Sequence, residues 1–312
     1  MTNTFPAEQP FSPEVTELIG AAGLDPVEVL GLVDTALDED LRYGPDVTTT
    51  ATVPPDAVAV AEITPRKPGT VAGLPLALAV FDRIFVNFRE APFGAGYQVL
   101  HRVEDGTRLP AGEPALVLRG STVGLLIAER TALNLACHLS GIATATAAWV
   151  DAVDGTGCAI RDSRKTLPGM RLLQKYAVRC GGGVNHRLGL GDAALIKDNH
   201  VLAAGSVGAA LAAVRAQSPG LPCEIEVDTL EQLDIVLGLE AEEVLLDNFT
   251  PEQCAEAVRR RDAAGVKTRL ESSGGLTLDV ATAYARTGVD YLSVGGLTHS
   301  SPALDLGMDL RG

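Results

Sequence analysis

The chain has 312 residues, with 40 acidic and 25 basic side chains and a net charge of −15 at neutral pH. This length predicts one large domain or two ordinary ones, and a hydrophobic content of 46% is enough to build a substantial core. The acidic balance argues against nucleic acids and anionic membranes as general partners, because Lys and Arg make most contacts to both.

Three features predict the compartment. The N-terminal stretch MTNTFPAEQPFSPEV lacks a basic region followed by an apolar run, so we expect no signal peptide. Asp82 and Arg83 interrupt the apolar stretch Val71–Phe88, which argues against a membrane span there. The five cysteines form no CxxC pair, so they predict buried thiols in a reducing compartment rather than disulfides or a zinc site. We therefore expect a cytoplasmic protein with no membrane partner.

The first half of the chain predicts a small mixed domain that ends in a long helix. Residues 1–25 begin as a Pro-rich, weakly ordered arm, and Pro26–Asp40 has apolar residues at helical spacing. From residue 58 to residue 118, short alternating apolar segments broken by Gly and Pro predict an antiparallel sheet, crossed by a helix over Leu76–Val86. The Ala-rich stretch Thr122–Val153 predicts one helix or two abutting ones.

The second half alternates regularly between strand and helix patterns. Strands are predicted over Cys158–Ile160, Ala193–Ile196, Cys223–Val227, Val244–Leu246, Lys267–Leu270 and Tyr291–Val294. Helices are predicted between them, over Met170–Cys180, Val207–Gln217, Leu230–Leu239, Pro251–Ala264 and Leu278–Thr287. Such alternation predicts parallel strands joined by helical crossovers, as in a β/α barrel or an open α/β sheet.

A basic segment lies within this acidic chain. Ile160–His200 carries eight Arg and Lys side chains against three Asp. A local positive cleft concentrates its field on an oppositely charged ligand, so this segment predicts an anion pocket. Arg171, Lys175 and Arg179 recur at helical spacing, which also fits a solvated helix face. A helix face does not explain the remaining basic residues, because they follow strands or a Gly-rich loop.

Charged or Gly-rich residues follow each predicted strand. In β/α barrels the loops at the carboxyl ends of the strands carry the active site, so these residues should converge on one mouth. The pairs Gly274-Gly275 and Gly295-Gly296, after the last two strands, predict a phosphate site built from backbone N–H groups. Glu226 and Asp247 could hold a divalent cation, directly or through water, or one of them could pair with a basic strand-end residue.

Other kinds of site find no support in the chain. It contains no GxSxG, no Walker loop and no GxGxxG after a strand, which argues against esterase, P-loop and dinucleotide functions. His186, His200 and His299 lack the spacing of zinc ligands. They suit hydrogen bonds to a carboxylate or a phosphate instead.

Long motifs in the chain resemble one enzyme family. They are ERTALN at Glu129–Asn134, DSRKTLPGMR at Asp162–Arg171 and KYAVRCGGGVNHRLGLGDAALIKDNH at Lys175–His200, followed in order by EIEVDT, LLDN, ESSGG and VGGLTHSSPALD. Together they resemble quinolinate phosphoribosyltransferase, also called nicotinate-nucleotide pyrophosphorylase (carboxylating), over nearly the whole chain after the first 25 residues. The resemblance implies that quinolinate and phosphoribosyl pyrophosphate react, with Mg²⁺, to give nicotinate mononucleotide, pyrophosphate and CO₂ in NAD biosynthesis.

The same resemblance implies a fold and an assembly. It implies an N-terminal α/β sandwich over residues 1–130, joined by the C-terminal segment 297–312. An incomplete β/α barrel of about six to seven strands would occupy residues 131–296. It also implies a homodimer or larger homo-oligomer with shared active sites, in which Arg130 reaches the carboxylate pocket of a neighbour.

Residue roles follow position by position from the resemblance. It implies that Lys165 meets the pyrophosphate end of the donor, with Glu226 and Asp247 near the donor's ribose and metal. Ser163 stands where the family more often has Thr, and since both offer a hydroxyl we expect little change. The dicarboxylate pocket would be lined by Arg130, Arg164, His186, Arg187 and Lys197. The 5′-phosphate cradle would comprise Ser273, Gly274, Gly275, Val294, Gly295 and Gly296, with His299 close by.

Two alternatives remain open. One is a related phosphoribosyltransferase for a monocarboxylate such as nicotinate, although the number of converging basic residues favours a dicarboxylate. The other is a non-catalytic binding protein for phosphate metabolites. Glu226 and Asp247 argue against it, because a pure binder would not need residues for a metal.

Overall fold

The computed structural model describes residues 11–87 and 96–311, which divide into two compact units. Unit 1 comprises the described residues of Met1–Thr144, Pro168–Gly181 and Ser301–Gly312, and unit 2 comprises Ala145–Leu167 and Gly182–Ser300. Helix α5 (Thr122–Val153) is one continuous helix with the predicted bounds, and it contributes to both units. The domain boundary expected after residue 130 therefore falls inside a helix.

Unit 1 is built on the antiparallel sheet that the alternating pattern predicted. Its strand order is β12-β1-β5-β3, and a ribbon of β2 and β4 accompanies it. The strands are β1 (Val58–Pro65), β2 (Gly69–Thr70), β3 (Tyr97–Arg102), β4 (Arg108–Leu109), β5 (Leu116–Ser121) and β12 (Leu306–Arg311). The C-terminal strand β12 thus forms one edge of this sheet, paired with β1.

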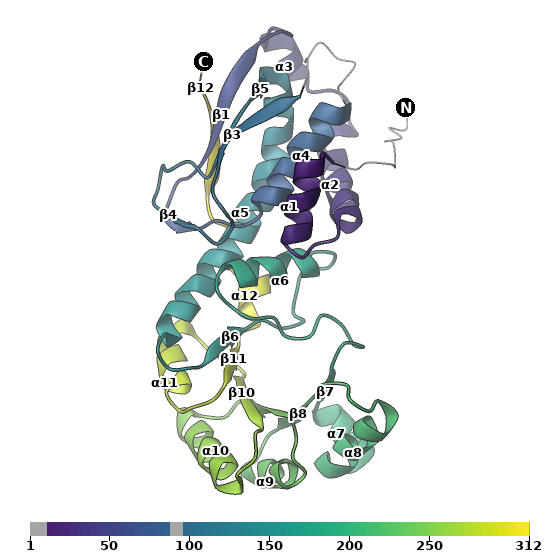
Figure 1. Cartoon of the computed structure of the whole chain (residues 1–312), viewed down its shortest axis with the longest axis vertical. Helices are drawn as coiled ribbons and strands as arrows, with labels where there is room; N and C mark the ends of the chain where they lie inside the picture. The colour runs from purple at the N-terminus through teal and green to yellow at the C-terminus, as the bar shows by residue number, and fades with distance from the viewer. Residues whose placement is uncertain (1–10, 88–95, 312) are drawn as a thin grey trace. The chain divides into compact units, whose positions relative to one another are not determined.

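The core of unit 1 lies between this sheet and its helices. Ala61 and Ile63 of β1 stand opposite Leu118 and Leu116 of β5, and all four side chains are buried. Every side chain from Leu74 to Phe85 of helix α4 is buried too. Figure 1 shows α1, α2 and α4 on one side of the sheet. The predicted helices over Pro26–Asp40 and Leu76–Val86 are confirmed as α2 (Pro26–Leu41) and α4 (Leu74–Asn87).

Unit 1 contains two helices that the sequence pattern missed, α1 (Pro13–Ala21) and α3 (Val47–Thr52). The expected weakly ordered arm was therefore wrong for α1, while residues 1–10 lie outside the described residues. The Ser12 hydroxyl accepts a hydrogen bond from the Val15 N–H at 3.3 Å, and Pro13 suits the first helical position. Val15 and Ile19 lie on one face of α1 and are buried, so packing holds this helix in place.

Unit 2 is built on a parallel sheet, as the alternating elements predicted. Its strand order is β6-β11-β10-β9-β8-β7, so β6 and β7 stand at its two edges within the described residues. The strands are β6 (Ala159–Arg161), β7 (Ala194–Ile196), β8 (Cys223–Val227), β9 (Glu243–Asp247), β10 (Arg269–Ser273) and β11 (Tyr291–Ser293). The strand expected over Lys267–Leu270 is displaced toward the C-terminus. Glu271 therefore lies inside a strand rather than in the loop after it.

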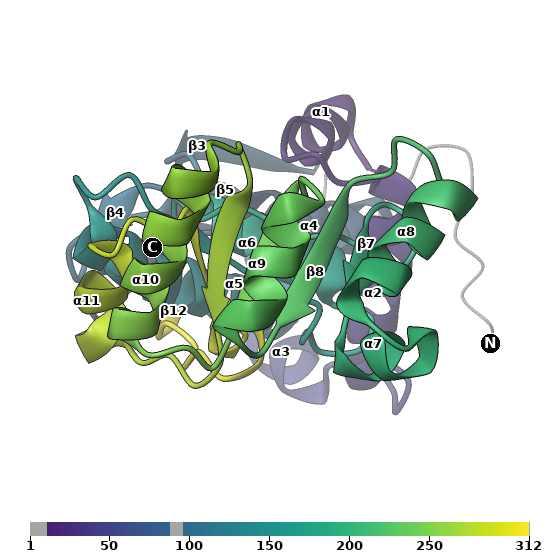
Figure 2. The same ribbon diagram turned by 90° about the horizontal axis from the view of Figure 1, so that it is seen from below.

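The two faces of the parallel sheet differ in chemistry. Side chains alternate along a strand, so Glu224 and Glu226 of β8 point to one face while Ile225 and Val227 point to the other. The register places Glu243, Asp247, Arg269, Glu271 and Ser273 on the face of the two glutamates. The opposite face is apolar except for Ser272, and α8, α9 and α10 lie side by side in front of the sheet in Figure 2.

Most helices of the second half have the predicted positions. They are α6 (Arg171–Cys180), α8 (Val207–Gln217), α9 (Leu230–Gly238) and α10 (Pro251–Ala264). The helix expected over Leu278–Thr287 is a 3₁₀ turn, η1 (Leu278–Val280), followed by the short α11 (Ala281–Ala285). Two short helices, α7 (Asp198–Ala204) and α12 (Gly296–His299), were missed. No helix in residues 11–87 and 96–311 combines the length and apolarity needed to cross a membrane.

Helix α6 corrects one interpretation of the basic segment. It belongs to unit 1, where the Tyr176 hydroxyl donates to Asp105 at 2.7 Å. Lys175 is fully buried, so a solvated helix face was wrong for this residue. Arg179 is exposed and donates to the Ala22 C=O at 2.7 Å. The basic spacing along α6 therefore reflects two different environments.

Candidate active site

The carboxyl ends of the parallel strands carry most of the predicted site residues of unit 2. Lys197 directly follows β7, Glu226 lies near the end of β8, and Asp247 is the last residue of β9. Lys197 Nζ donates to Glu226 Oε2 at 2.5 Å. The side chain of Glu226 is 8% exposed and that of Lys197 is 47% exposed. This pair therefore joins a buried acid to a base that solvent reaches.

Glu226 is part of an acidic cluster with Asp228 and Asp247. Ligand oxygens from the three carboxylates lie within 4.8 Å of one another. Burial, and then the charges of Glu226 and Asp228, raise the pKa of Asp247. Carboxylate oxygens at this separation suit a hard divalent cation, because Mg²⁺ and Ca²⁺ prefer oxygen ligands. The residues present thus fit the metal that the resemblance implies.

A second group of predicted residues surrounds Gly295, which follows β11. A β-carbon at this position would come within 2.9 Å of Lys165 Cδ and 3.4 Å of Ser163 Oγ. It would also come within 3.7 Å of His299 Nε2. The Ser163 hydroxyl accepts a hydrogen bond from the Lys165 N–H at 3.0 Å. Gly295 therefore leaves room for three predicted site residues to meet.

The turn after β11 is held to the loop after β6. The Val294 N–H donates to the Arg161 C=O at 2.9 Å, and Val294 is buried. The Thr298 hydroxyl donates to the Lys165 C=O at 2.8 Å. Gly296 begins α12 between these two contacts. The backbone of the predicted phosphate cradle is thereby fixed beside the loop that carries Lys165.

Gly274 and Gly275 turn the chain directly after β10. Their φ angles of 104° and 60° lie in the left-handed region, which favours glycine. A β-carbon on Gly274 would overlap the side-chain oxygen of Asn248. The Asn248 N–H donates to the Ser273 C=O at 2.9 Å, which ties the ends of β9 and β10 together. Glycine at position 274 therefore lets two strand ends close tightly, as a cradle for a phosphate requires.

Arg164 and Arg187 form the basic part of the site. Burial, and then the charge of Arg164, lower the pKa of Arg187, so the positive charge of Arg164 acts on Arg187. The Nε atom of each is buried and has no hydrogen-bond partner among the described residues. Arg187 donates from Nη1 to the Ala193 C=O at 3.2 Å. Two neighbouring cations with buried unused donors are suited to a ligand with two negative groups.

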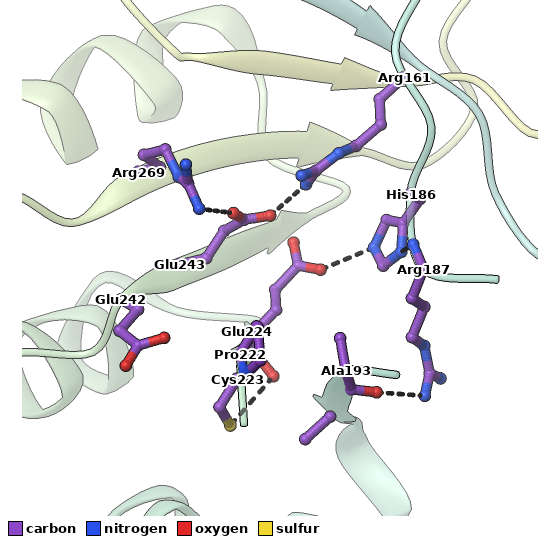
Figure 3. Close-up of a pocket in the computed structure, with 11 residues that line it drawn as sticks. Arg161, His186, Arg187, Ala193, Pro222, Cys223, Glu224, Glu242, Glu243 and Arg269 are labelled. Atoms are coloured by element: carbon purple, nitrogen blue, oxygen red, sulfur yellow. Dashed lines mark hydrogen bonds and ion pairs between the residues drawn. The ribbon is translucent and has the colours of Figure 1, made fainter. Parts of the chain in front are cut away.

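His186 and Arg187 also border a cavity of about 110 Å³ at the amino ends of the strands (Figure 3). His186 Nε2 lies 2.7 Å from Glu224 Oε2. On the other side of Glu224, Arg161 donates to Glu243 and Glu271. His186 is thus directed toward the start of β8, whereas Lys197 pairs with Glu226 near the end of the same strand.

The remaining predicted residue, Arg130, lies outside unit 2. It is exposed on the part of α5 that belongs to unit 1. An exposed guanidinium there is available to another molecule. Its expected place in a neighbouring subunit's pocket stays a prediction.

Comparison with known protein families covers both units. The model for the quinolinate phosphoribosyl transferase N-terminal domain matches residues 46–140, and the model for the C-terminal domain of the same enzyme matches residues 142–309. The chain belongs to the quinolinate phosphoribosyltransferase family. The resemblance carried by the long motifs is thereby confirmed.

Known members of the quinolinate phosphoribosyltransferase family resemble the chain over most of its length. The nicotinate-nucleotide pyrophosphorylase (carboxylating) of Mycobacterium leprae is 62% identical over 276 residues, covering 88% of this chain and 94% of the relative. The human protein of that name is 36% identical over 290 residues, covering 92% and 93%. The solved structure of the Francisella tularensis nicotinate-nucleotide pyrophosphorylase has a TM-score of 0.82 at 35% identity, covering 91% of this chain and 96% of that chain.

Several buried acids of this quinolinate phosphoribosyltransferase family member were missed from the sequence. Asp162, Glu224 and Glu271 are buried, and Asp162 accepts from the His186 N–H at 2.8 Å. Burial, and then the charge of Glu243, raise the pKa of Glu224 to about 8. Burial, and then Glu224, raise the pKa of Glu271 to about 7. The sequence held one sign of such buried acids, because β8 carries carboxylates at alternate positions of an otherwise apolar strand. Such carboxylates share a face of the sheet and must find partners there.

Proposed function

We propose that the chain transfers the phosphoribosyl group of phosphoribosyl pyrophosphate to quinolinate, with loss of CO₂, to give nicotinate mononucleotide. Pyrophosphate is the other product, and the reaction belongs to NAD biosynthesis. Family membership over both units supports this activity. The names of the Mycobacterium leprae and human relatives agree with it.

The observation that carries the proposal is the pair Arg164 and Arg187. Each guanidinium keeps a buried Nε–H without a partner among the described residues, beside a second positive charge. A planar carboxylate accepts two parallel N–H bonds from one guanidinium, so two arginines match the two acidic groups of quinolinate. His186 directly precedes Arg187 in the same loop, and Lys197 is exposed at the end of β7. We assign these four residues to the dicarboxylate pocket.

The donor is assigned to the carboxyl ends of the late strands. Ser273, Gly274 and Gly275 after β10, with Val294, Gly295 and Gly296 after β11, would hold the 5′-phosphate, and His299 lies beside them. Lys165 would bind the pyrophosphate end. Glu226 and Asp247, with Asp228, would hold Mg²⁺ directly, through water or through the donor. A divalent cation bound there would neutralise charge on the departing pyrophosphate.

The chain's own residues orient the substrates and help to stabilise the reacting groups. The quinolinate nitrogen forms a bond to the ribose C1 as the bond from C1 to the pyrophosphate oxygen breaks. Lys165 stabilises the leaving anion electrostatically. The bond to the 2-carboxylate then breaks, its electron pair stays beside the positively charged ring nitrogen, and a proton replaces CO₂. The arginines hold the ring in place during both steps.

A covalent nucleophile has no place in this scheme. Burial raises the pKa of the Cys158 thiol to about 12 and that of the Cys254 thiol to about 11. Both thiols are therefore protonated at neutral pH, and a thiol is a poor nucleophile compared with a thiolate. Charge stabilisation and orientation carry the reaction instead.

The finer architecture is also part of the proposal. We propose that unit 2 is an incomplete β/α barrel whose polar sheet face forms the interior, and that unit 1 is an α/β sandwich. The charged side chains gathered on one face of the parallel sheet support a barrel, because the barrel interior receives the face that helices do not cover. We further propose a cytoplasmic homodimer or larger homo-oligomer in which Arg130 enters a neighbour's dicarboxylate pocket.

One assay separates this function from its alternatives. The full chain is incubated with phosphoribosyl pyrophosphate, Mg²⁺ and either quinolinate or nicotinate, and release of pyrophosphate and CO₂ is measured. We expect kcat/KM for quinolinate to exceed that for nicotinate by at least about 30-fold, since the monoacid leaves a buried cation unpaired. Comparable values would favour a monocarboxylate enzyme. No pyrophosphate release with either acid would favour a binding protein.

Mixing two inactive variants tests the shared site. Arg130→Ala and Lys197→Ala should each be nearly inactive. In a mixed dimer, one site has both groups and the other has neither. Random subunit exchange should therefore restore activity to about a quarter of wild type for an isologous pair. If verified exchange restores nothing, Arg130 acts within its own chain.

A further inference from the structure

A chain of hydrogen bonds runs from the buried Glu224 to the backbone of Arg187. His186 Nε2 lies 2.7 Å from Glu224 Oε2. The Arg187 N–H donates to the other ring nitrogen, His186 Nδ1, at 2.7 Å. Figure 3 shows His186 between the two, with the Arg187 side chain extended toward Ala193. The imidazole thus links an acid at the start of β8 to the basic loop.

These contacts fix the tautomer of His186. Because Nδ1 accepts a hydrogen bond from a backbone N–H, it carries no proton of its own. The single proton of the neutral ring must then be on Nε2, which donates it to Glu224. Glu224 Oε2 accepts in both protonation states of the carboxyl group, since a proton can reside on Oε1, which has no partner among the described residues. Both ring nitrogens are therefore used within the protein.

His186 is held at both its ring and its backbone. The side chains of Glu224 and His186 are 6% and 10% exposed, so water competes little for the bond between them. The His186 N–H also donates to Asp162 Oδ1 at 2.8 Å, and the Asn185 side chain donates to Asp162 Oδ2 at 2.6 Å. Asp162 thus anchors the backbone on one side of the ring, and Glu224 anchors the ring itself.

We infer that Glu224 is a positioning residue, which acts through His186 to fix the backbone of Arg187 and so the place where its guanidinium meets a substrate carboxylate. This inference rests on the proposed function for its link to quinolinate. It assigns His186 a supporting role toward Arg187, beyond lining the pocket. The hydrogen-bond chain itself stands independently of any activity.

The chain of hydrogen bonds is tested first by its own signature. In protein labelled with ¹⁵N-histidine, long-range ¹H–¹⁵N correlation spectra report which ring nitrogen carries the proton, and His186→Asn assigns the signal. We expect His186 as the Nε2–H tautomer in wild type and in Glu224→Gln, whose amide oxygen still accepts. In Glu224→Ala the Nε2 proton loses its buried acceptor, so the Nε2–H signal should shift from its wild-type position. A wild-type His186 that is protonated on Nδ1 would overturn the inference.

The second test compares three variants by steady-state kinetics. Glu224→Ala should raise KM for quinolinate about 10-fold while KM for phosphoribosyl pyrophosphate stays within about twofold, and Glu224→Gln should restore most of the loss. Glu243→Gln is the matched control, because Glu243 is equally buried but forms its ion pairs with Arg161 and Arg269.

The outcomes separate the inference from the proposed function. If Glu243→Gln raises KM for quinolinate as much as Glu224→Ala does, or if both substrates weaken equally, the role is purely structural and the inference is wrong. If wild type does not turn over quinolinate, the proposed function fails. The spectra then decide the hydrogen-bond chain alone, and an Nε2–H signal that shifts when Glu224 is removed supports it. Should Glu224→Ala not fold, Glu224→Gln and the wild-type spectrum still give the decision.

Discussion

The two ends of the parallel sheet use similar charged side chains in opposite ways. From the end of β6, the Arg161 side chain extends toward the amino ends of β9 and β10, where it lies between Glu243 and Glu271, and all three are largely buried. At the carboxyl ends, Lys197 is half exposed beside Glu226, and glycines keep the neighbouring turns open. The first group satisfies its charges within the protein. The second leaves Lys197 accessible to solvent and so to ligands, so exposure separates structural charge from functional charge in these two groups.

The largest expected effect is at the amino end. Arg161→Met leaves Glu271, which is fully buried, without its ion pair, and should lower the free energy of unfolding by about 3–5 kcal/mol. Urea denaturation measures this loss. Arg269→Met is the control, because its pair to Glu243 involves a side chain that is 54% exposed, and it should cost about 0–1 kcal/mol. Equal small losses would show that the buried ion pairs matter little.

The next effect should appear in catalysis rather than in stability. Arg187→Ala removes one of the two guanidiniums and should lower kcat/KM for quinolinate at least about 30-fold. This corresponds to a rise of about 2–5 kcal/mol in the activation free energy. Its unfolding free energy should change far less than that of Arg161→Met. Arg259→Ala, an exposed arginine of α10, serves as the control and should change neither quantity. A stability loss as large as that of Arg161→Met would instead group Arg187 with the buried ion pairs.

A smaller effect is expected at the turn after β10. Gly274→Ala places a β-carbon against Asn248 and should raise KM for phosphoribosyl pyrophosphate about 10-fold by disturbing the cradle. Gly265→Ala is matched to it, because Gly265 also has a positive φ, of 67°, but has open space around it. Both variants carry the cost of a β-carbon at positive φ, on the order of 1–2 kcal/mol. If they raise KM equally, strain rather than the cradle is the cause.

The smallest expected effect is a change in pH dependence. Burial, and then Glu224, raise the folded-state pKa of Glu271 to about 7, above its ordinary value of 4.5. Between these values the folded protein binds more protons than the unfolded chain, so the free energy of unfolding should fall as pH rises through about 7. Glu271→Gln should flatten this decline, because glutamine binds no proton in this range. Unfolding titrations at several pH values measure the slope, and an unchanged slope would assign the proton to another group.

The sequence predicted the carboxyl end of the sheet far better than the amino end. Lys197 and Asp247 stand where apolar strands stop, so local pattern was enough to find them. Glu271 was placed in a loop because a charged residue appeared to end the apolar run. In fact β10 continues to Ser273, since Arg161, 110 positions earlier in the chain, neutralises the glutamate. Pairing at such separation leaves no local trace.

Local pattern also failed where helices were short or their burial unusual. Helix α7 spans seven residues and begins with Asp198, so it offered too little periodicity to detect. Lys175 is buried within an otherwise plausible charged helix face. The direction of His186 toward Glu224 required the register of β8, because a strand pattern does not reveal which end of the sheet a distant loop will reach. Tertiary packing decided each of these features.

The pairing of β12 with β1 has a consequence for synthesis of the chain on the ribosome. Every segment of unit 2 is translated before Leu306, so unit 2 can fold while unit 1 still lacks one strand of its sheet. Until β12 arrives, β1 has an open edge, and open edges invite pairing with other chains. Nascent chains that still lack β12 should therefore depend on chaperones more than chains that contain it, and a strand made after all of unit 2 closes the first sheet of the chain.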